Sequence, residues 1–166
     1  AGLLALGSTL VTAAPANAIS TDGWWGSETS LGLQKFMNAI MTATWSDEDG
    51  EVTAIPTVVD GVISSQPSSM APACPGIVGG WEWVEGSQAA GSPTMLAMYQ
   101  WLGLGTSSQN IFLKTQEWGQ NVTGYTITAV HIKLLQEHYG LTADGTFDGP
   151  SPTIKALQNE INQYVG

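Results

Sequence analysis

Apolar residues recur at helical spacing in four stretches of the chain. Within residues 31–36, 95–102, 132–139 and 154–161 they return every two to four positions, which is typical of one face of an amphipathic helix. Strand signals are fewer, because the β-branched run over residues 51–63 is interrupted by Pro56. Helices this short are not stable alone and have to pack on one another. The pattern therefore predicts an all-α fold of short helices joined by turns.

Two of the predicted helices follow the same kind of turn. Residues 22–36 and 144–158 both run Asp-Gly, an aromatic residue, Gly, and then a helix that contains Leu-Gln. Asp-Gly favours a tight turn, because Gly accepts positive φ and the Asp side chain bonds nearby backbone. A third pair, Asp60-Gly61, has similar surroundings. The chain therefore contains a weak internal repeat.

Two further stretches keep the helix of the repeat and lose the Asp-Gly turn directly before it. They are residues 94–99 and 131–136, and each is followed by Gly-Leu. Tyr99 also stands where the other copies have Gln. Whether these middle copies bind a ligand stays open at this point.

The repeated motif resembles that of the peptidoglycan-binding-like domain, a bundle of three short helices appended to cell-wall hydrolases such as muramidases and amidases. The resemblance extends over most of residues 19–166. It implies short three-helix units in tandem, a first unit at residues 19–88 with an irregular tail and a second at residues 89–166. The Pro- and Gly-rich stretch from Pro67 to Gly80 is then a long irregular connection.

The first 18 residues have a different character. They are apolar and uncharged, and they end in Ala16-Asn17-Ala18, which has the small residues that a signal peptidase accepts. The stretch is short for a transmembrane helix and has no positive leading segment. We expect residues 1–18 to be a truncated signal peptide that is cleaved after Ala18, which predicts a secreted bacterial protein with no membrane association afterwards.

Charge and rare residues exclude several kinds of partner and cofactor. The chain has 166 residues, with 14 acidic residues against 4 lysines and no Arg, for a net charge of −10. Such a chain has little with which to neutralise nucleic-acid phosphates or an anionic membrane. Its one cysteine, Cys74, excludes a disulfide framework or a multi-Cys zinc site. The histidines, His131 and His138, are about two helical turns apart, roughly 10 Å, so each is expected on the polar edge of its helix, and no metal or cofactor is predicted.

Seven tryptophans in a chain with only 11% charged residues suit a carbohydrate ligand. The apolar face of a sugar stacks on an indole ring, although a Trp also commonly fills the core of a small domain. Adjacent residues cannot both face inward, so one of Trp24 and Trp25 is expected to be exposed, and the alternating Trp81 and Trp83 are expected to share a face. With two lysines that follow the repeat helices, the predicted glycan-binding residues are Trp24, Trp25, Trp81, Trp83, Lys35 and Lys155.

These observations predict a secreted, non-catalytic protein of the cell wall that binds peptidoglycan or another wall glycan. Two alternatives stay open. One is a small muralytic glycoside hydrolase that uses Glu82 and Glu85, the carboxylate pair beside Trp81 and Trp83. The other is a scaffold for a protein partner.

Overall fold

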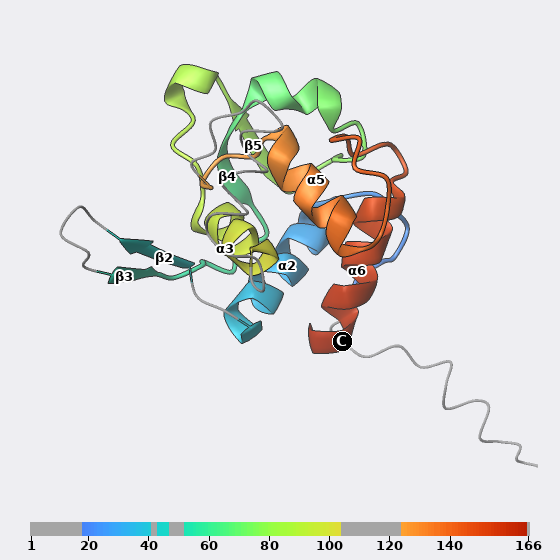
Figure 1. Cartoon of the computed structure of the whole chain (residues 1–166), viewed down its shortest axis with the longest axis horizontal. Helices are drawn as coiled ribbons and strands as arrows, with labels where there is room; N and C mark the ends of the chain where they lie inside the picture. Colours follow the sequence, from blue (N-terminus) through green and yellow to red (C-terminus); the bar gives the residue numbers. More distant parts are fainter. Residues whose placement is uncertain (1–17, 41–42, 47–51, 104–123, 166) are drawn as a thin grey trace, which may run out of the picture.

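The computed structural model describes residues 18–40, 43–46, 52–103 and 124–165, so the expected signal segment, apart from Ala18, lies outside the described residues. Four helices form the body of the molecule: α2 (Ser27–Ile40), α3 (Pro93–Leu102), α5 (Ala129–His138) and α6 (Pro152–Val165) (Figure 1). They coincide with the four stretches of helical spacing. In the described part of the chain, no helix is both long and apolar enough to cross a membrane.

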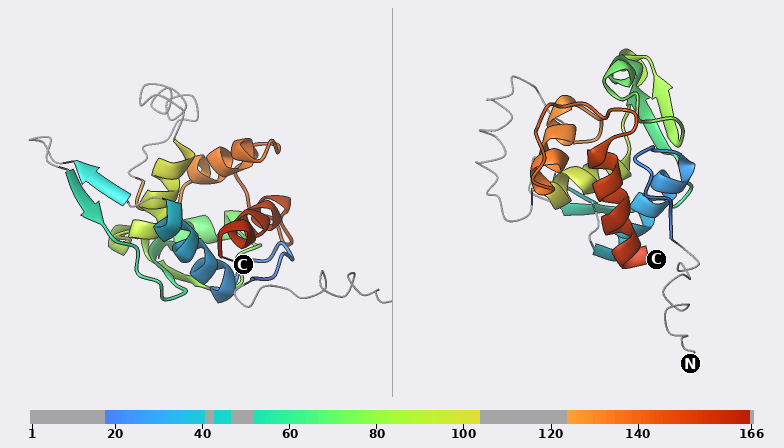
Figure 2. Two further views of the ribbon diagram at one scale, coloured as in Figure 1. Left: turned by 90° about the horizontal axis from the view of Figure 1, so that it is seen from below. Right: turned by 90° about the vertical axis from the view of Figure 1, so that its right-hand side faces the viewer.

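The expectation of an all-α fold built from tandem three-helix units is wrong. Strands β2 (Ala43–Ser46) and β3 (Val52–Ile55) pair antiparallel, and this hairpin projects from the helices (Figures 1 and 2). Strands β4 (Ile63–Pro67) and β5 (Trp81–Val84) form a parallel pair. Pro56 lies just beyond the end of β3, so it bounds that strand and does not prevent it.

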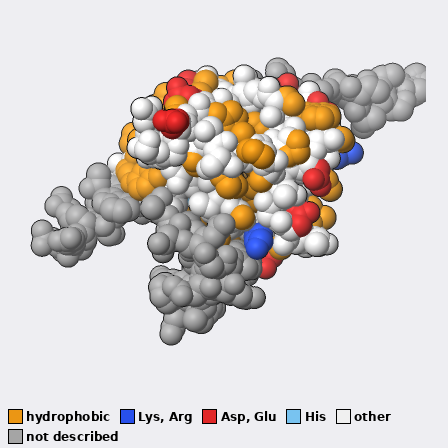
Figure 3. All heavy atoms as spheres, turned by 90° about the horizontal axis from the view of Figure 1, so that it is seen from above, with side chains coloured by type: hydrophobic (Ala, Val, Ile, Leu, Met, Phe, Trp, Pro, Cys, Tyr) orange, Lys and Arg blue, Asp and Glu red, His pale blue; other side chains and the backbone are white. Residues whose placement is uncertain are grey.

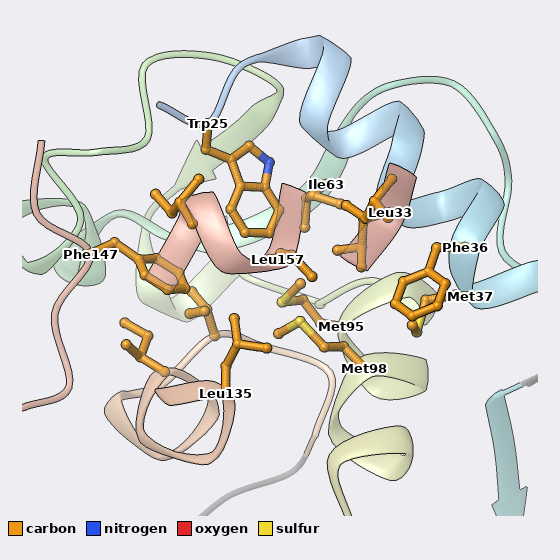
Figure 4. Close-up of a cluster of buried hydrophobic side chains, with 14 of the residues drawn as sticks. Trp25, Leu33, Phe36, Met37, Ile63, Met95, Met98, Leu135, Phe147 and Leu157 are labelled. Carbon is orange, nitrogen blue, oxygen red and sulfur yellow. The ribbon is translucent and has the colours of Figure 1, made fainter. Parts of the chain in front are cut away.

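Helices from the two ends of the chain also pack together, which a tandem arrangement does not provide. α6 lies against α2, and Asn162 of α6 bonds both backbone groups of Ile19, at 2.8 Å and 2.9 Å. One hydrophobic core joins all four helices: Trp25, Leu33, Met95, Leu135 and Leu157 meet in it (Figure 4). The molecule therefore has a single core that contains residues from both predicted units.

The stretch from Pro67 to Gly80, which was expected to be an irregular connection, is largely fixed by hydrogen bonds. It begins with the 3-10 helix η1 (Ser68–Ala73) and leads into β5, after which a second 3-10 turn, η2 (Gly86–Gln88), precedes α3. Between η1 and β5 the backbone passes next to residues far away in the sequence. Gly76 accepts a hydrogen bond from the N–H of Trp25 at 2.8 Å and donates one to Phe147 at 2.9 Å. A Cβ at Gly76 would lie 2.0 Å from the Asp148 carbonyl oxygen, so only glycine fits here.

Candidate functional site

Each of the four helices is preceded by one copy of the same turn, and the copies are more complete than the sequence indicates. Turn 1 is residues 22–24, turn 2 is residues 60–62, turn 3 begins at Gly124, and turn 4 is residues 144–146. Each contains a glycine at positive φ, between 77° and 86°, at Gly23, Gly61, Gly124 and Gly145. A residue with 0% exposure enters the core two positions after the glycine in turns 1, 2 and 4 (Trp25, Ile63 and Phe147) and three positions after it in turn 3 (Ile127).

The middle copies therefore do have a turn. Turn 2 belongs to α3, but β4, η1, β5 and η2 are inserted between the two, which is why the helix at Thr94 seems to stand without one. Turn 3 precedes α5 and has Thr123 in the place of Asp, so it keeps the glycine and loses the Asp-Gly pattern. The four copies share the positive φ of the glycine and the buried residue that follows it.

Three of the turns are held by a buried glutamine from a neighbouring helix. Gln34 of α2 bonds turn 2, Gln136 of α5 bonds turn 4, and Gln158 of α6 bonds turn 1. In each case the amide oxygen accepts from the glycine N–H, at 2.8 Å, 3.0 Å and 2.9 Å respectively, and the NH₂ group donates back to the same turn. The Leu-Gln of the repeat marks these glutamines, but the sequence does not say which turn each of them holds.

Turn 1 fixes an exposed indole. The N–H of Trp24 donates to Asp22 Oδ1 at 2.9 Å, and its carbonyl accepts from Gln158 Nε2 at 2.8 Å. The ring lies against Gly149, where a Cβ would come within 2.6 Å of it. Trp24 is 37% exposed and Trp25 is fully buried, so the expectation that one of the pair faces outward is confirmed, and Trp25 is not accessible to a ligand.

Trp81 and Trp83 share a face, as their alternation predicts. Their rings stack on each other with centroids 5.3 Å apart and an 18° angle between planes, and Trp81 also meets the edge of Trp25. Both are half-buried against the core, and Trp81 Nε1 is buried and has no hydrogen-bond partner among the residues that the structure describes. Trp81 therefore packs mainly inside the molecule and offers less free ring surface than Trp24.

The remaining predicted site residues do not join a common site. Lys35 is half-buried on α2, Lys155 is exposed on α6, and within the described residues no hydrogen bond connects either one to a tryptophan. Glu82 and Glu85 are both exposed, and Glu82 accepts from the N–H of Ser65 at 2.9 Å. Ser65 has a φ of 55°, so this carboxylate stabilises a backbone conformation that non-glycine residues rarely adopt.

The two histidines have different environments. His138 is exposed and lies 3.0 Å from Glu160. His131 is fully buried, contrary to the expectation of a polar helix edge: Nδ1 accepts from the Thr128 N–H at 3.2 Å, which caps α5, and Nε2 lies 3.2 Å from the Gly124 carbonyl. Burial lowers the pKa of His131 from 6.5 to about 4, so the ring is neutral at pH 7.

The described residues contain neither a cluster of metal ligands nor an activated thiol. They contain no group of three His, Cys, Asp or Glu side chains that could hold a metal ion. Cys74 is buried, and burial raises the pKa of its thiol to about 12, which disfavours the reactive thiolate. The surface seen from above carries apolar and uncharged polar side chains with few charged ones (Figure 3).

Searches for related proteins found no matching family model, no matching curated protein and no matching solved structure.

Proposed function

We propose that this protein is a secreted, non-catalytic binding protein of the bacterial cell wall, and that it binds peptidoglycan or a related wall glycan by stacking a sugar ring on Trp24. The proposal is supported above all by the way Trp24 is held. Its backbone is bonded on both sides, and its ring is packed on Gly149 while 37% of its surface stays exposed. A fixed aromatic ring loses little conformational entropy when a ligand packs on it.

The composition of the chain suits an uncharged ligand with many hydroxyl groups. Only 11% of all residues are charged, so much of the surface consists of Ser, Thr, Asn, Gln and Gly. Aromatic rings combine a large apolar surface with a polar group at the rim, which matches a sugar's apolar face and polar edge. The net charge of −10 disfavours anionic polymers, so attraction to a wall has to come from uncharged sugar faces.

Hydrolysis is the less favoured alternative. A glycosidase needs one carboxyl group whose pKa is raised by an apolar environment, so that it can act as a general acid near neutral pH. Glu82 and Glu85 are both exposed, and Glu82 already accepts a backbone hydrogen bond. Neither carboxylate has the buried environment that this role requires.

Sedimentation of the protein with purified insoluble peptidoglycan tests the proposal. We expect the protein to pellet with the wall material, and we expect Trp24→Val to weaken binding at least about fivefold. Valine is the residue that turn 2 carries at this position, Val62, so the hydrogen bonds of the turn are retained. Tyr164→Ala is the matched control, because Tyr164 is 55% exposed on α6 and is unrelated to turn 1.

Salt and turbidity measurements separate the alternatives. Binding through sugar stacking should stay constant or rise between about 0.05 and 0.5 M salt, because salt screens repulsion between like charges. Binding that weakens with salt would point to Lys35 and Lys155 instead of Trp24. Clearing of a wall suspension that is lost in Glu82→Gln would make the protein a hydrolase. A protein that stays in the supernatant at every salt concentration would refute wall binding and leave the scaffold function.

A further inference from the structure

A pocket lies between turn 2 and the start of α3. Its volume is about 130 Å³, and it is lined by Gln34, Val58, Asp60, Val62, Ser64, Ser92, Pro93 and Thr94. Pockets that take a whole small-molecule ligand usually measure about 300–1,000 Å³. This one is large enough for a single side chain or the end of a chain, and too small for a sugar residue with its neighbours.

Asp60 supplies the only formal charge in the lining of this pocket. Its Oδ1 accepts from Gln34 Nε2 at 3.0 Å and from the Val62 N–H at 2.9 Å. These bonds hold the pKa of the carboxyl below its ordinary value of 3.8, so Asp60 is ionised at neutral pH. None of the lining residues is basic. The described lining of the pocket therefore carries one negative charge and no positive one.

Two of the neighbouring polar side chains already have hydrogen-bond partners. Gln34 makes four hydrogen bonds with turn 2, two through Oε1 and two through Nε2, which is the full capacity of its amide. At the start of α3, Pro93 has no N–H, and the Ser92 hydroxyl accepts from the Met95 N–H at 3.1 Å. Asp60 is the charged group of the described lining, and its carboxylate therefore determines the sign of the ligand.

We infer that this pocket binds a primary alkylammonium group, with the ammonium at Asp60 and the methylene stem against the apolar rim. Val58 and Val62 are 67% and 40% exposed at that rim, and Pro93 lines the pocket with them. Long amine side chains combine an apolar stem with a charged end in this way. A divalent cation would need several oxygen ligands, carboxylates among them, whereas the described lining of the pocket has one carboxylate. The inference does not depend on the proposed function, because it concerns a different part of the surface from Trp24.

The test is an NMR titration of ¹⁵N-labelled protein with n-butylammonium chloride at constant ionic strength, with 1-butanol as the neutral probe. We expect saturable, millimolar binding of the ammonium that shifts the amide signals of Val62 and Thr94, and at least about tenfold weaker binding of the alcohol. Equal binding of both probes, or no saturable shift at these residues, would overturn the inference.

Turn 4 provides a matched control. Asp144 accepts from Gln136 Nε2 at 2.7 Å and from the Thr146 N–H at 3.0 Å, as Asp60 does in turn 2, but it is not part of this pocket. Asp60→Asn should weaken ammonium binding about tenfold or more, whereas Asp144→Asn should leave it unchanged. Equal losses in both variants would show that the effect is structural, and would refute the site.

A variant at an exposed position guards against misfolding of Asp60→Asn. Val62→Lys places a cation beside Asp60 at a side chain that is 40% exposed, and it should weaken binding at least about fivefold, whereas unchanged binding would count against the site.

Two probes represent the two natural sources of an alkylammonium group, Nα-acetyl-lysine amide for a lysine side chain and butane-1,4-diamine for a free diamine. Tighter binding of the first indicates a peptide side chain and tighter binding of the second a free diamine, and failure of both to compete with n-butylammonium refutes the site. No wall material is present, so failure here leaves Trp24 binding standing.

Discussion

Turns 1 and 3 are stabilised in different ways, although both contain a glycine at positive φ that is followed by a buried residue. Turn 1 is held by Gln158 from α6, whose amide also donates to Thr29 Oγ1 at 3.0 Å. At turn 3 the preceding helix has Tyr99 in the place of Gln, and Gln66 of β4 takes over: Oε1 accepts from the Ile127 N–H at 2.7 Å and Nε2 donates to the Tyr125 carbonyl at 3.2 Å. The turn thus requires an amide that satisfies its buried backbone groups, and that amide can come from a helix or from an inserted strand.

The largest expected effect tests turn 1. Gln158→Leu should reduce the free energy of unfolding by about 3–5 kcal/mol, because it leaves the Gly23 N–H and the Trp24 carbonyl without partners. Urea unfolding measures the loss. Gln163→Leu is the control, because Gln163 is exposed on the same helix and should change stability little. A loss below about 1 kcal/mol for Gln158→Leu would mean that the turn does not depend on this amide.

A pH effect should distinguish turn 3 from the others, because His131 joins it to the cap of α5. The pKa of His131 is lowered from 6.5 to about 4, so between these values the unfolded chain binds a proton that the folded protein does not. Its stabilising contribution is full above pH 6.5 and falls by about 3 kcal/mol as the pH drops towards 4. Unfolding in urea at several pH values measures this slope.

His131→Gln isolates that contribution. Gln at the third helical position commonly accepts the N–H of the capping residue, so the cap can be retained without a titrating ring. The variant should lose most of the pH dependence between 6.5 and 4, whereas His138→Gln at the exposed position should keep it. An unchanged slope in His131→Gln would assign the pH dependence to other groups.

The smallest of the three effects compares the strand and helix glutamines directly. Gln66→Leu removes the partners of Ile127 N–H and Tyr125 carbonyl, and Gln136→Leu removes those of Gly145 N–H and Thr146 carbonyl. Each should lose about 2–3 kcal/mol in urea unfolding, and the two losses should agree within about 1 kcal/mol. A much smaller loss for Gln66→Leu would show that turn 3 is stable without a glutamine.

The local elements could be predicted from the sequence, whereas the way they interlock could not. Helical spacing located all four helices, and Asp-Gly located turns 1, 2 and 4, since both signals depend on residues close together in the chain. The pairing of Gln158 with turn 1 joins residues 135 positions apart, and nothing local encodes it. The same is true of the backbone bond from Trp25 to Gly76, which gives an apparently irregular segment its shape.

The candidate site was predicted in part for the same reason. That Trp24 and Trp25 face opposite ways follows from their adjacency, but which of them is buried depends on the distant Gly149 and Gly76. The burial of His131 was missed because its role as the partner of the Thr128 N–H replaces the usual Gln or Glu. The pocket at Asp60 was missed because its lining comes from three separate segments, residues 34, 58–64 and 92–94.

The bond between Gln158 and turn 1 also has a consequence for the order of synthesis. Translation produces turn 1 before α6, so the Gly23 N–H and the Trp24 carbonyl have no partner until almost the whole described chain has been made. Until then α2 lacks α6, one of the helices against which it packs. The nascent chain therefore cannot complete the contacts of turn 1 and α2 before α6 has left the ribosome, and a ribosome-bound intermediate should remain sensitive to proteases until then.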